Sequence, residues 1–130
     1  MPGGFTLDLP LVPSLNGAYV AIPGKRVPSK EHVDWKRAAG WTIQTMKPRP
    51  EPVTGPYTLT LLVPQKMRGD VSNRPKLLED LLVEMGLTPD DSRAEAVVCR
   101  RDRSISAGMC RVTVEAVGDE SISRGRDEPR

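Results

Sequence analysis

The chain has 130 residues and a mass of 14.3 kDa, which is the size of one domain. Its composition, 38% hydrophobic and 28% charged, is that of an ordinary globular protein. Aromatic residues make up only 4%, which argues against a single-strand nucleic-acid binder built on rows of stacking rings. The two cysteines, Cys99 and Cys110, are too few for a disulfide framework or a four-ligand zinc site, so we expect two reduced thiols.

The net charge of +2 conceals an uneven distribution along the chain. Residues 1–69 hold nine Lys/Arg and four Asp/Glu, whereas residues 70–91 hold six acidic residues against Arg74 and Lys76. Five arginines follow in residues 92–111. An acidic segment between basic ones can hold a polyanion beside a metal ion, although mixed surface charge has the same signature.

The sequence lacks the signals of a membrane, secreted or nucleotide-binding protein. No run approaches the roughly 20 apolar residues of a membrane span. The N-terminus has no basic region and carries Asp8, which is unlike a signal peptide. No strand–loop–helix context carries Gly-Lys-Ser/Thr. We therefore expect a cytoplasmic protein with no membrane partner and no nucleotide cofactor.

The first half of the chain predicts a strand, a long loop and a helix. Residues 5–9 alternate apolar and polar side chains, as in a half-buried strand. A proline- and glycine-containing loop follows over 10–28, with a candidate short strand at 19–22. A helix is expected from Ser29, a good N-cap, to about Met46. Its inward side is expected to hold Val33, Ala39 or Gly40, Ile43 and, as a further candidate, Trp41, and its outward side Lys30, Lys36 and Arg37.

The second half predicts a strand, a helix and two further strands. Residues 57–63 alternate well, and residues 74–85 carry a leucine stripe that ends before Gly86. Ser72 or Asn73 is the expected helix cap. Residues 94–101 and 111–117 are expected to form strands joined as a hairpin, across which the two cysteines can face each other.

These elements predict a single α+β domain over residues 1–117, with a mixed or antiparallel sheet and two helices. The tail over 118–130 is charged and poor in apolar residues, so we expect it to be disordered.

Carboxylates lie at both ends of the second predicted helix. Asp70 precedes it, and Asp90 and Asp91 follow it. A helix of about 12 residues is roughly 18 Å long, so the segment 87–93 has to fold back for the two ends to meet. If they meet, an oxygen-only ligand set suits Mg²⁺ or Mn²⁺, and Lys76 and Arg68 can neutralise phosphate charge. Alternatively, the Asp90–Asp91 pair is turn chemistry and Lys76 pairs with Asp80 at i,i+4.

From about residue 5 to 117 the sequence resembles the RusA family of crossover junction endodeoxyribonucleases, the Holliday junction resolvases of bacteria, phages and prophages. Residues 9–19, Leu-Pro-Leu-Val-Pro-Ser-Leu-Asn-Gly-Ala-Tyr, are similar to the family's Pro-Pro-Ser-x-Asn segment and following tyrosine. The family's Arg-x-Asp-x-Asp-Asn-x-x-Lys motif is followed by a helical aspartate, a glycine and a late Asp-Asp pair. Its counterparts here are Asp70, Asn73, Lys76, Asp80, Gly86, Asp90 and Asp91.

The resemblance implies a homodimeric, Mg²⁺-dependent endonuclease that introduces symmetric nicks in four-way DNA junctions. It assigns catalysis to Asp70 and Asp91 with Lys76 as the supporting cation, and makes Asp90 a further candidate ligand. One position departs from the pattern, because Ser72 stands where the family has its second motif aspartate. Ser72 can bind the metal as a neutral ligand while Asp90 supplies the missing charge; the enzyme can be weakened or prefer Mn²⁺; or the protein binds junctions without cutting them.

Basic side chains supply candidate DNA contacts outside this motif. One group lies in the loop and first helix, and a second lies near the expected hairpin turn; the alternative for both is solvated surface. Phosphate contacts of this kind give affinity without reading sequence. The expected DNA-binding residues are Lys25, Arg26, Lys30, Lys36, Arg37, Arg68, Asn73, Arg74, Arg100 and Arg101, with Arg103 beside them.

Three classes of function stay open at this point. The first is a metal-dependent endonuclease of branched DNA, and the second is a catalytically inactive junction-binding relative. The third is a small structural or interaction protein with no nucleic-acid role. His32, the single histidine, has no partner in the sequence that suggests a catalytic pair, and we expect it to be an exposed helix residue.

Overall fold

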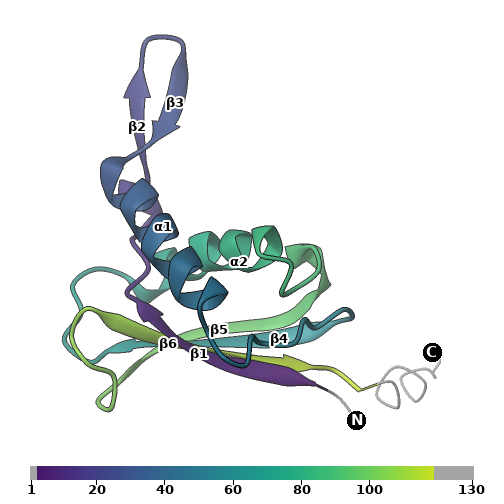
Figure 1. The fold of residues 1–130 in the computed structure, drawn as a ribbon. Coiled ribbons are helices and arrows are strands. Elements are labelled where there is room, and N and C mark those ends of the chain that lie inside the picture. Colours follow the sequence, from purple (N-terminus) through teal and green to yellow (C-terminus); the bar gives the residue numbers. More distant parts are fainter. Residues whose placement is uncertain (1–2, 119–130) are drawn as a thin grey trace, which may run out of the picture.

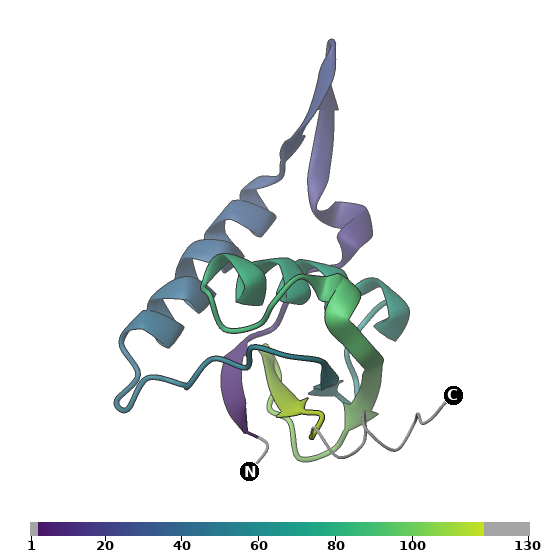
Figure 2. The same cartoon turned by 90° about the vertical axis from the view of Figure 1, so that its right-hand side faces the viewer.

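The computed structural model describes residues 3–118 and shows an α+β domain with a mixed four-stranded sheet and two α-helices, which confirms the predicted fold class. The strand order is β1-β6-β4-β5. Both helices lie on one face of the sheet, and a small two-stranded ribbon projects away from it (Figures 1 and 2). The elements are β1 (Gly4–Pro10), β2 (Tyr19–Ile22), β3 (Lys25–Pro28), α1 (Lys30–Gln44), β4 (Tyr57–Pro64), α2 (Pro75–Glu84), β5 (Ala94–Asp102) and β6 (Met109–Ala116). Three 3₁₀ turns accompany them: η1 (Leu15–Gly17), η2 (Val71–Asn73) and η3 (Asp91–Arg93).

The predicted hairpin between the last two strands is wrong, because β4 lies between β5 and β6. β5 pairs with β4 in parallel, and β6 pairs antiparallel with both β4 and β1. Parallel neighbours need a crossover, and α2 supplies it between β4 and β5. Cys99 is consequently aligned with Leu61 and Cys110 with Leu9, and both thiols are free, as expected.

The projecting ribbon contains the candidate strand at 19–22 as β2 and, in the part of the chain where only a loop was expected, a second strand, β3. Ile22 pairs with Lys25, so Pro23 and Gly24 form a two-residue turn. Gly24 has a φ of +85°, a conformation that glycine adopts without strain. Proline followed by glycine is the sequence signal for such a turn.

Helix α1 begins after the predicted cap, since the Ser29 hydroxyl accepts a hydrogen bond from the backbone N–H of His32. Its buried side chains are Trp35, Ala39 and Ile43. The expected inward positions Val33 and Trp41 are instead exposed, Trp41 by 68%. The three buried residues are spaced four positions apart and form the side of α1 that faces the core. The Trp35 indole N–H donates a hydrogen bond to the carbonyl of Pro10 at 2.8 Å, and this bond joins the helix to the end of β1.

His32 is partly buried, contrary to the exposed position expected for it. Its Nδ1 lies 3.1 Å from the carbonyl oxygen of Ala18, and its ring meets the Tyr19 ring edge to face at 5.3 Å. These contacts join α1 to the base of the ribbon.

Strand β4 and helix α2 form the centre of the core. Tyr57, Leu59, Leu61 and Val63 are buried on the predicted face of β4. The leucine stripe of α2 packs against them, with Leu77, Leu78, Leu81 and Leu82 buried. The expected cap is wrong, because η2 occupies residues 71–73 and Arg74 becomes the N-cap, without a side-chain capping bond. Pro75 then fits the first turn, where a proline loses no hydrogen bond.

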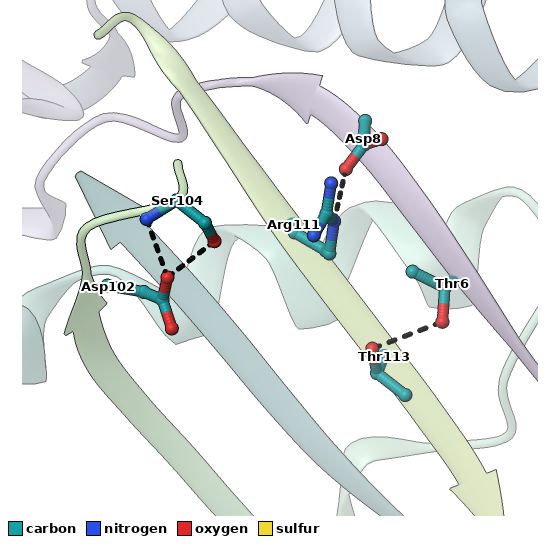
Figure 3. Close-up of polar contacts among 6 residues, drawn as sticks. All are labelled: Thr6, Asp8, Asp102, Ser104, Arg111 and Thr113. Atoms are coloured by element: carbon teal, nitrogen blue, oxygen red, sulfur yellow. Dashed lines mark hydrogen bonds and ion pairs between the residues drawn. The ribbon is translucent and has the colours of Figure 1, made fainter. Parts of the chain in front are cut away.

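The sheet face turned away from the helices is polar. Asp8 pairs with Arg111 at 2.7 Å, and the Thr6 and Thr113 hydroxyls lie 3.2 Å apart across β1 and β6 (Figure 3). Asp102 accepts hydrogen bonds from Ser104 at the end of β5 (Figure 3). No helix within residues 3–118 is long and apolar enough to cross a bilayer. Apart from Gly118, the tail predicted to be disordered lies outside the described residues.

Candidate functional site

The segment after α2 folds back along the helix, which the sequence allowed but did not require. The backbone N–H of Gly86 donates to the Val83 carbonyl and that of Leu87 to the Leu82 carbonyl, the Schellman pattern of a helix end. Gly86 provides the required positive φ of +76°. The carbonyl of Leu87 also accepts from the backbone N–H of Val53, which holds the returning chain against the 47–56 connector.

This return places Asp91 at the first turn of α2. The ammonium nitrogen of Lys76 lies 2.5 Å from Oδ2 of Asp91 and 3.2 Å from Oδ1 of Asp80. The hydrogen bonds that Lys76 donates to Asp91 and then to Asp80 raise the pKa of Lys76, so this side chain stays positively charged at neutral pH. The bond to Lys76, followed by one to Asp90, lowers the pKa of Asp91, which stays ionised. Lys76 therefore forms both ion pairs: the i,i+4 pair with Asp80, which was the alternative interpretation, and the long-range pair with Asp91.

Asp90 takes part in the turn that presents Asp91. Its Oδ1 accepts a hydrogen bond from the backbone N–H of Ser92 at 3.2 Å, and its carbonyl accepts one from Arg93. This is the Asx-type turn that the Asp-Asp pair also indicated. Asp90 therefore has a structural role here, and its role as a ligand stays a prediction.

Asp70 lies at the same end of α2, at the N-cap position of η2, and its side chain makes no capping bond and is exposed. Ser72, within η2, is exposed as well. Across residues 3–118, no three His, Cys, Asp or Glu side chains come together closely enough to hold a metal ion. The fold therefore puts Asp70 and Asp91 at one end of a helix but does not form a three-carboxylate centre within the described chain.

Two arginines that were expected to bind DNA also hold the Asp70 loop, through hydrogen bonds to backbone carbonyls. Arg101 on β5 donates to the carbonyls of Gln65, Met67 and Gly69. Arg74 donates to the carbonyls of Arg68 and Val12. These bonds give both guanidinium groups a structural role; DNA contact by either stays a prediction. Gly69 has a φ of +90°, so the loop needs glycine at this point.

Two polar residues next to the site, Glu79 and Thr88, were not singled out by any sequence pattern. Glu79 is half-buried on α2, where burial and then the charge of Asp91 raise its pKa. Burial also raises the pKa of the Tyr57 phenol, and the charge of Glu79 adds to this, whereas the neighbouring Thr88 hydroxyl opposes it. By the geometry of their contacts, neither hydroxyl forms a hydrogen bond with another described residue. The spacing of three residues from Lys76 is the signal that places Glu79 on the same helix face.

The other basic residues are spread over the ribbon, α1 and β5. Arg26 lies over the Tyr19 ring at 5.1 Å, and Lys25 is exposed at the ribbon turn. Lys30 pairs with Asp34 and Lys36 with Glu84, each at 2.6 Å, and the second pair joins α1 to α2. Exposed basic residues without such ion pairs in the described chain include Arg37, Arg68 and Arg100. Asn73, the remaining candidate contact, is partly buried in η2.

No protein-family model matches this chain. No curated protein matches it either. The resemblance to the RusA family therefore rests on the sequence motifs described above and on no further comparison.

Proposed function

We propose that this protein is a divalent-metal-dependent endodeoxyribonuclease that introduces symmetric nicks in branched, four-way DNA by hydrolysing phosphodiester bonds. The observation that carries the proposal is the return of Asp91 to Lys76 at the start of α2. Asp70 precedes the same helix end through η2. Asp70 before the helix and Asp91 after it thus both lie toward the N-terminal end of α2, which supports the proposal of a shared site.

The donors at this helix end fit Mg²⁺ or Mn²⁺ in their chemistry, because they are carboxylate and hydroxyl oxygens without histidine or cysteine. Mg²⁺ is commonly held by one or two carboxylates, with water and substrate phosphate completing its shell, so three converging carboxylates are not required. Asp70 and Asp91 would hold it, with Asp90 and Ser72 as further candidates. The ion would polarise the phosphodiester and generate the attacking hydroxide.

The chain's own residues bind and orient the phosphate. Lys76, which stays protonated, neutralises charge on the phosphate next to Asp91. Arg74 and Arg101 hold the loop that presents Asp70, and Arg68 on that loop is free to meet the DNA backbone. Lys25 and Arg26 lie on the projecting ribbon (Figure 1), where they would contact phosphates of a neighbouring arm of the junction.

Ser72 is the observation that favours a second candidate function, a branched-DNA-binding protein with weakened or lost catalysis. A hydroxyl at this exposed position contributes no negative charge, so the metal would be held less tightly than by the family's aspartate. The two candidates share the DNA surface and differ only in the metal-dependent step.

A cleavage assay on a labelled four-way junction with Mg²⁺, Mn²⁺ or EDTA tests the proposal. We expect paired symmetric nicks that need metal and disappear in Asp70→Asn and Asp91→Asn. The matched control Asp34→Asn makes the same chemical change on α1, away from the site, and should cut like the parent protein. A shifted but uncut junction in both metals would establish the binding-only alternative. Failure to bind the junction at low salt would contradict both the endonuclease and the binding-only function.

A further inference from the structure

We propose that the ribbon of β2 and β3 enters the minor groove of a duplex DNA arm, with Ile22 and Pro23 at its tip against the bases and Lys25 on a flanking phosphate. The inference rests on the proposed function, which brings branched DNA to this protein, and adds the part of the DNA that the ribbon meets. The observations that carry it are the fixed base of the ribbon, its exposed apolar face and its charge.

The base of the ribbon is fastened to helix α1, so the tip projects in a defined direction (Figures 1 and 2). The backbone N–H of Ser29 donates to the Ala18 carbonyl at 2.8 Å, which ties the start of the helix to the chain entering β2. The same carbonyl lies 3.1 Å from Nδ1 of His32, whose ring meets the Tyr19 ring. The Arg26 guanidinium group lies over Tyr19 as well, 5.1 Å from the ring centre.

The two faces of the ribbon differ, because directly opposed residues of an antiparallel pair point to the same side. The face that carries the tyrosine and arginine contacts consists of the pairs Tyr19–Pro28 and Ala21–Arg26. The other face consists of the pairs Val20–Val27 and Ile22–Lys25. Val20 and Ile22 are 47% and 42% exposed, and within residues 3–118 the core and the side chains packed against it include no apolar residue of this second face. The ribbon therefore presents an apolar strip that ends beside a lysine.

The charge of the ribbon selects an anionic partner. Residues 9–30 contain three basic residues and no Asp or Glu. Lys25 lies directly after the turn at the tip and has no ion pair among the described residues. An apolar strip beside an unpaired cation fits a DNA groove, where phosphates line the rims and sugars and bases lie between them.

The side chains of the ribbon favour the minor groove over the major groove. Reading base edges in the major groove uses amide, carboxylate, hydroxyl or guanidinium groups. Over residues 19–28 the neutral polar side chains are reduced to the Tyr19 phenol at the base, and the Arg26 guanidinium group lies over that ring. Proteins that bind the minor groove insert apolar side chains, including isoleucine and proline, between base steps. Ile22 and Pro23 supply these two residue types at the tip.

The dimensions of the ribbon make deformation of the DNA part of binding. Each strand has four residues, which span roughly 13 Å at about 3.4 Å per residue, more than the groove depth of about 7.5 Å. The two backbones alone are about 4.8 Å apart and the groove is about 6 Å wide, so the groove has to widen around the side chains. Insertion of this kind bends a duplex toward its major groove. The ribbon would thus select DNA by its deformability, without reading sequence.

Binding of the full chain to a labelled four-way junction with A·T-rich arms, in EDTA, tests the inference without the metal-dependent step. We expect distamycin, which occupies the minor groove of A·T sequences, to displace the protein, and methyl green, which occupies the major groove, to leave it bound. Ile22→Ser should weaken binding by about tenfold, because the tip loses its apolar contact, and Ile22→Leu should bind like the parent protein. Val33→Ser on α1 is the matched control, since Val33 is 41% exposed, and should also bind like the parent.

Energy transfer between dyes at the two ends of a linear duplex is the second measurement. We expect the parent protein to shorten the end-to-end distance and Ile22→Ser, at saturating concentration, to leave the duplex straight. Circular dichroism checks that the variants fold. Binding and bending without nicks in Mg²⁺ would support the role of the ribbon while contradicting the cleavage proposal.

Three results would overturn the inference whatever the cleavage assay shows. The first is junction binding that withstands distamycin, with Ile22→Ser binding like the parent protein. The second is displacement by methyl green alone, which would place the contact in the major groove. The third is Ile22-dependent binding to vesicles of phosphatidylserine and phosphatidylcholine with unchanged junction binding, which would assign the ribbon to a membrane surface.

Discussion

The ammonium nitrogen of Lys76 and Oδ2 of Asp91 lie 2.5 Å apart, although the residues are fifteen positions apart in sequence and belong to different elements. The side chains are 52% and 31% exposed, so water screens the pair. Exposed ion pairs contribute about 0 to 1 kcal/mol to stability. The pair therefore contributes little to the stability of the fold, and in the proposed function its role is to position two charged groups.

Replacement of Asp91 separates those two roles. We expect Asp91→Asn to abolish metal-dependent junction cleavage while lowering the free energy of unfolding by no more than about 1 kcal/mol. Because the folded-state pKa of Asp91 is lowered, its stabilising contribution is present above about pH 4, the usual unfolded value, and is lost as pH falls through the folded-state pKa. Urea unfolding at pH 7 and pH 3 should show the variant and parent converging in acid. A large loss of stability at pH 7 would assign Asp91 to the fold.

The Ser72 position decides between the two candidate functions. Ser72→Asp restores a carboxylate next to the Asp70 loop, so we expect faster Mg²⁺-dependent cleavage and a lower Mg²⁺ requirement. Rates on a four-way junction over a Mg²⁺ titration measure this. Ser92→Asp, the same change in η3, serves as the control for added charge. An unchanged Mg²⁺ dependence in Ser72→Asp would mean that residue 72 lies outside the metal shell.

Two adjacent arginines on β5 should behave differently. Arg101→Ala removes the donors that hold three loop carbonyls, so we expect a loss of about 2 kcal/mol in the free energy of unfolding. Arg100→Ala changes an exposed residue and should leave stability within about 0.5 kcal/mol while weakening DNA binding. Urea denaturation and junction binding across a salt series measure the two effects. Equal stability of both variants would remove the structural role of Arg101.

Glu79 should show the opposite pH dependence to Asp91. Its folded-state pKa is raised by burial, so the ionised form is disfavoured by folding, and stability falls as pH rises from about 4.3 through the folded-state pKa. Glu79→Gln removes this penalty. We expect the variant to be slightly more stable than the parent at pH 7, with the difference disappearing below about pH 4. A variant that is less stable at pH 7 would indicate that the carboxylate makes a stabilising bond.

The local hydrophobic pattern of the sequence was enough to predict strands and helices in which one face is regularly apolar and buried. The alternation in residues 57–63 and the leucine stripe of α2 identified their buried sides correctly, because period alone determines which side chains point together. The N-cap at Ser29 and the helix end at Gly86 were also local signals. The same reasoning failed for Val33 and Trp41, because α1 is oriented by the Trp35 bond to Pro10, a contact with another element.

The charged groups available at the site, namely Asp70, Lys76 and the Asp90–Asp91 pair, could be identified from the order of residues alone. The return of Asp91 to Lys76 could not be predicted in this way, because the path of the chain includes a hydrogen bond to the Leu87 carbonyl from Val53, 34 positions earlier in the chain. The parallel pairing of β5 with β4 was likewise a tertiary outcome. Strand periodicity specifies a face, whereas the choice of neighbouring strand is made by contacts between segments far apart in sequence.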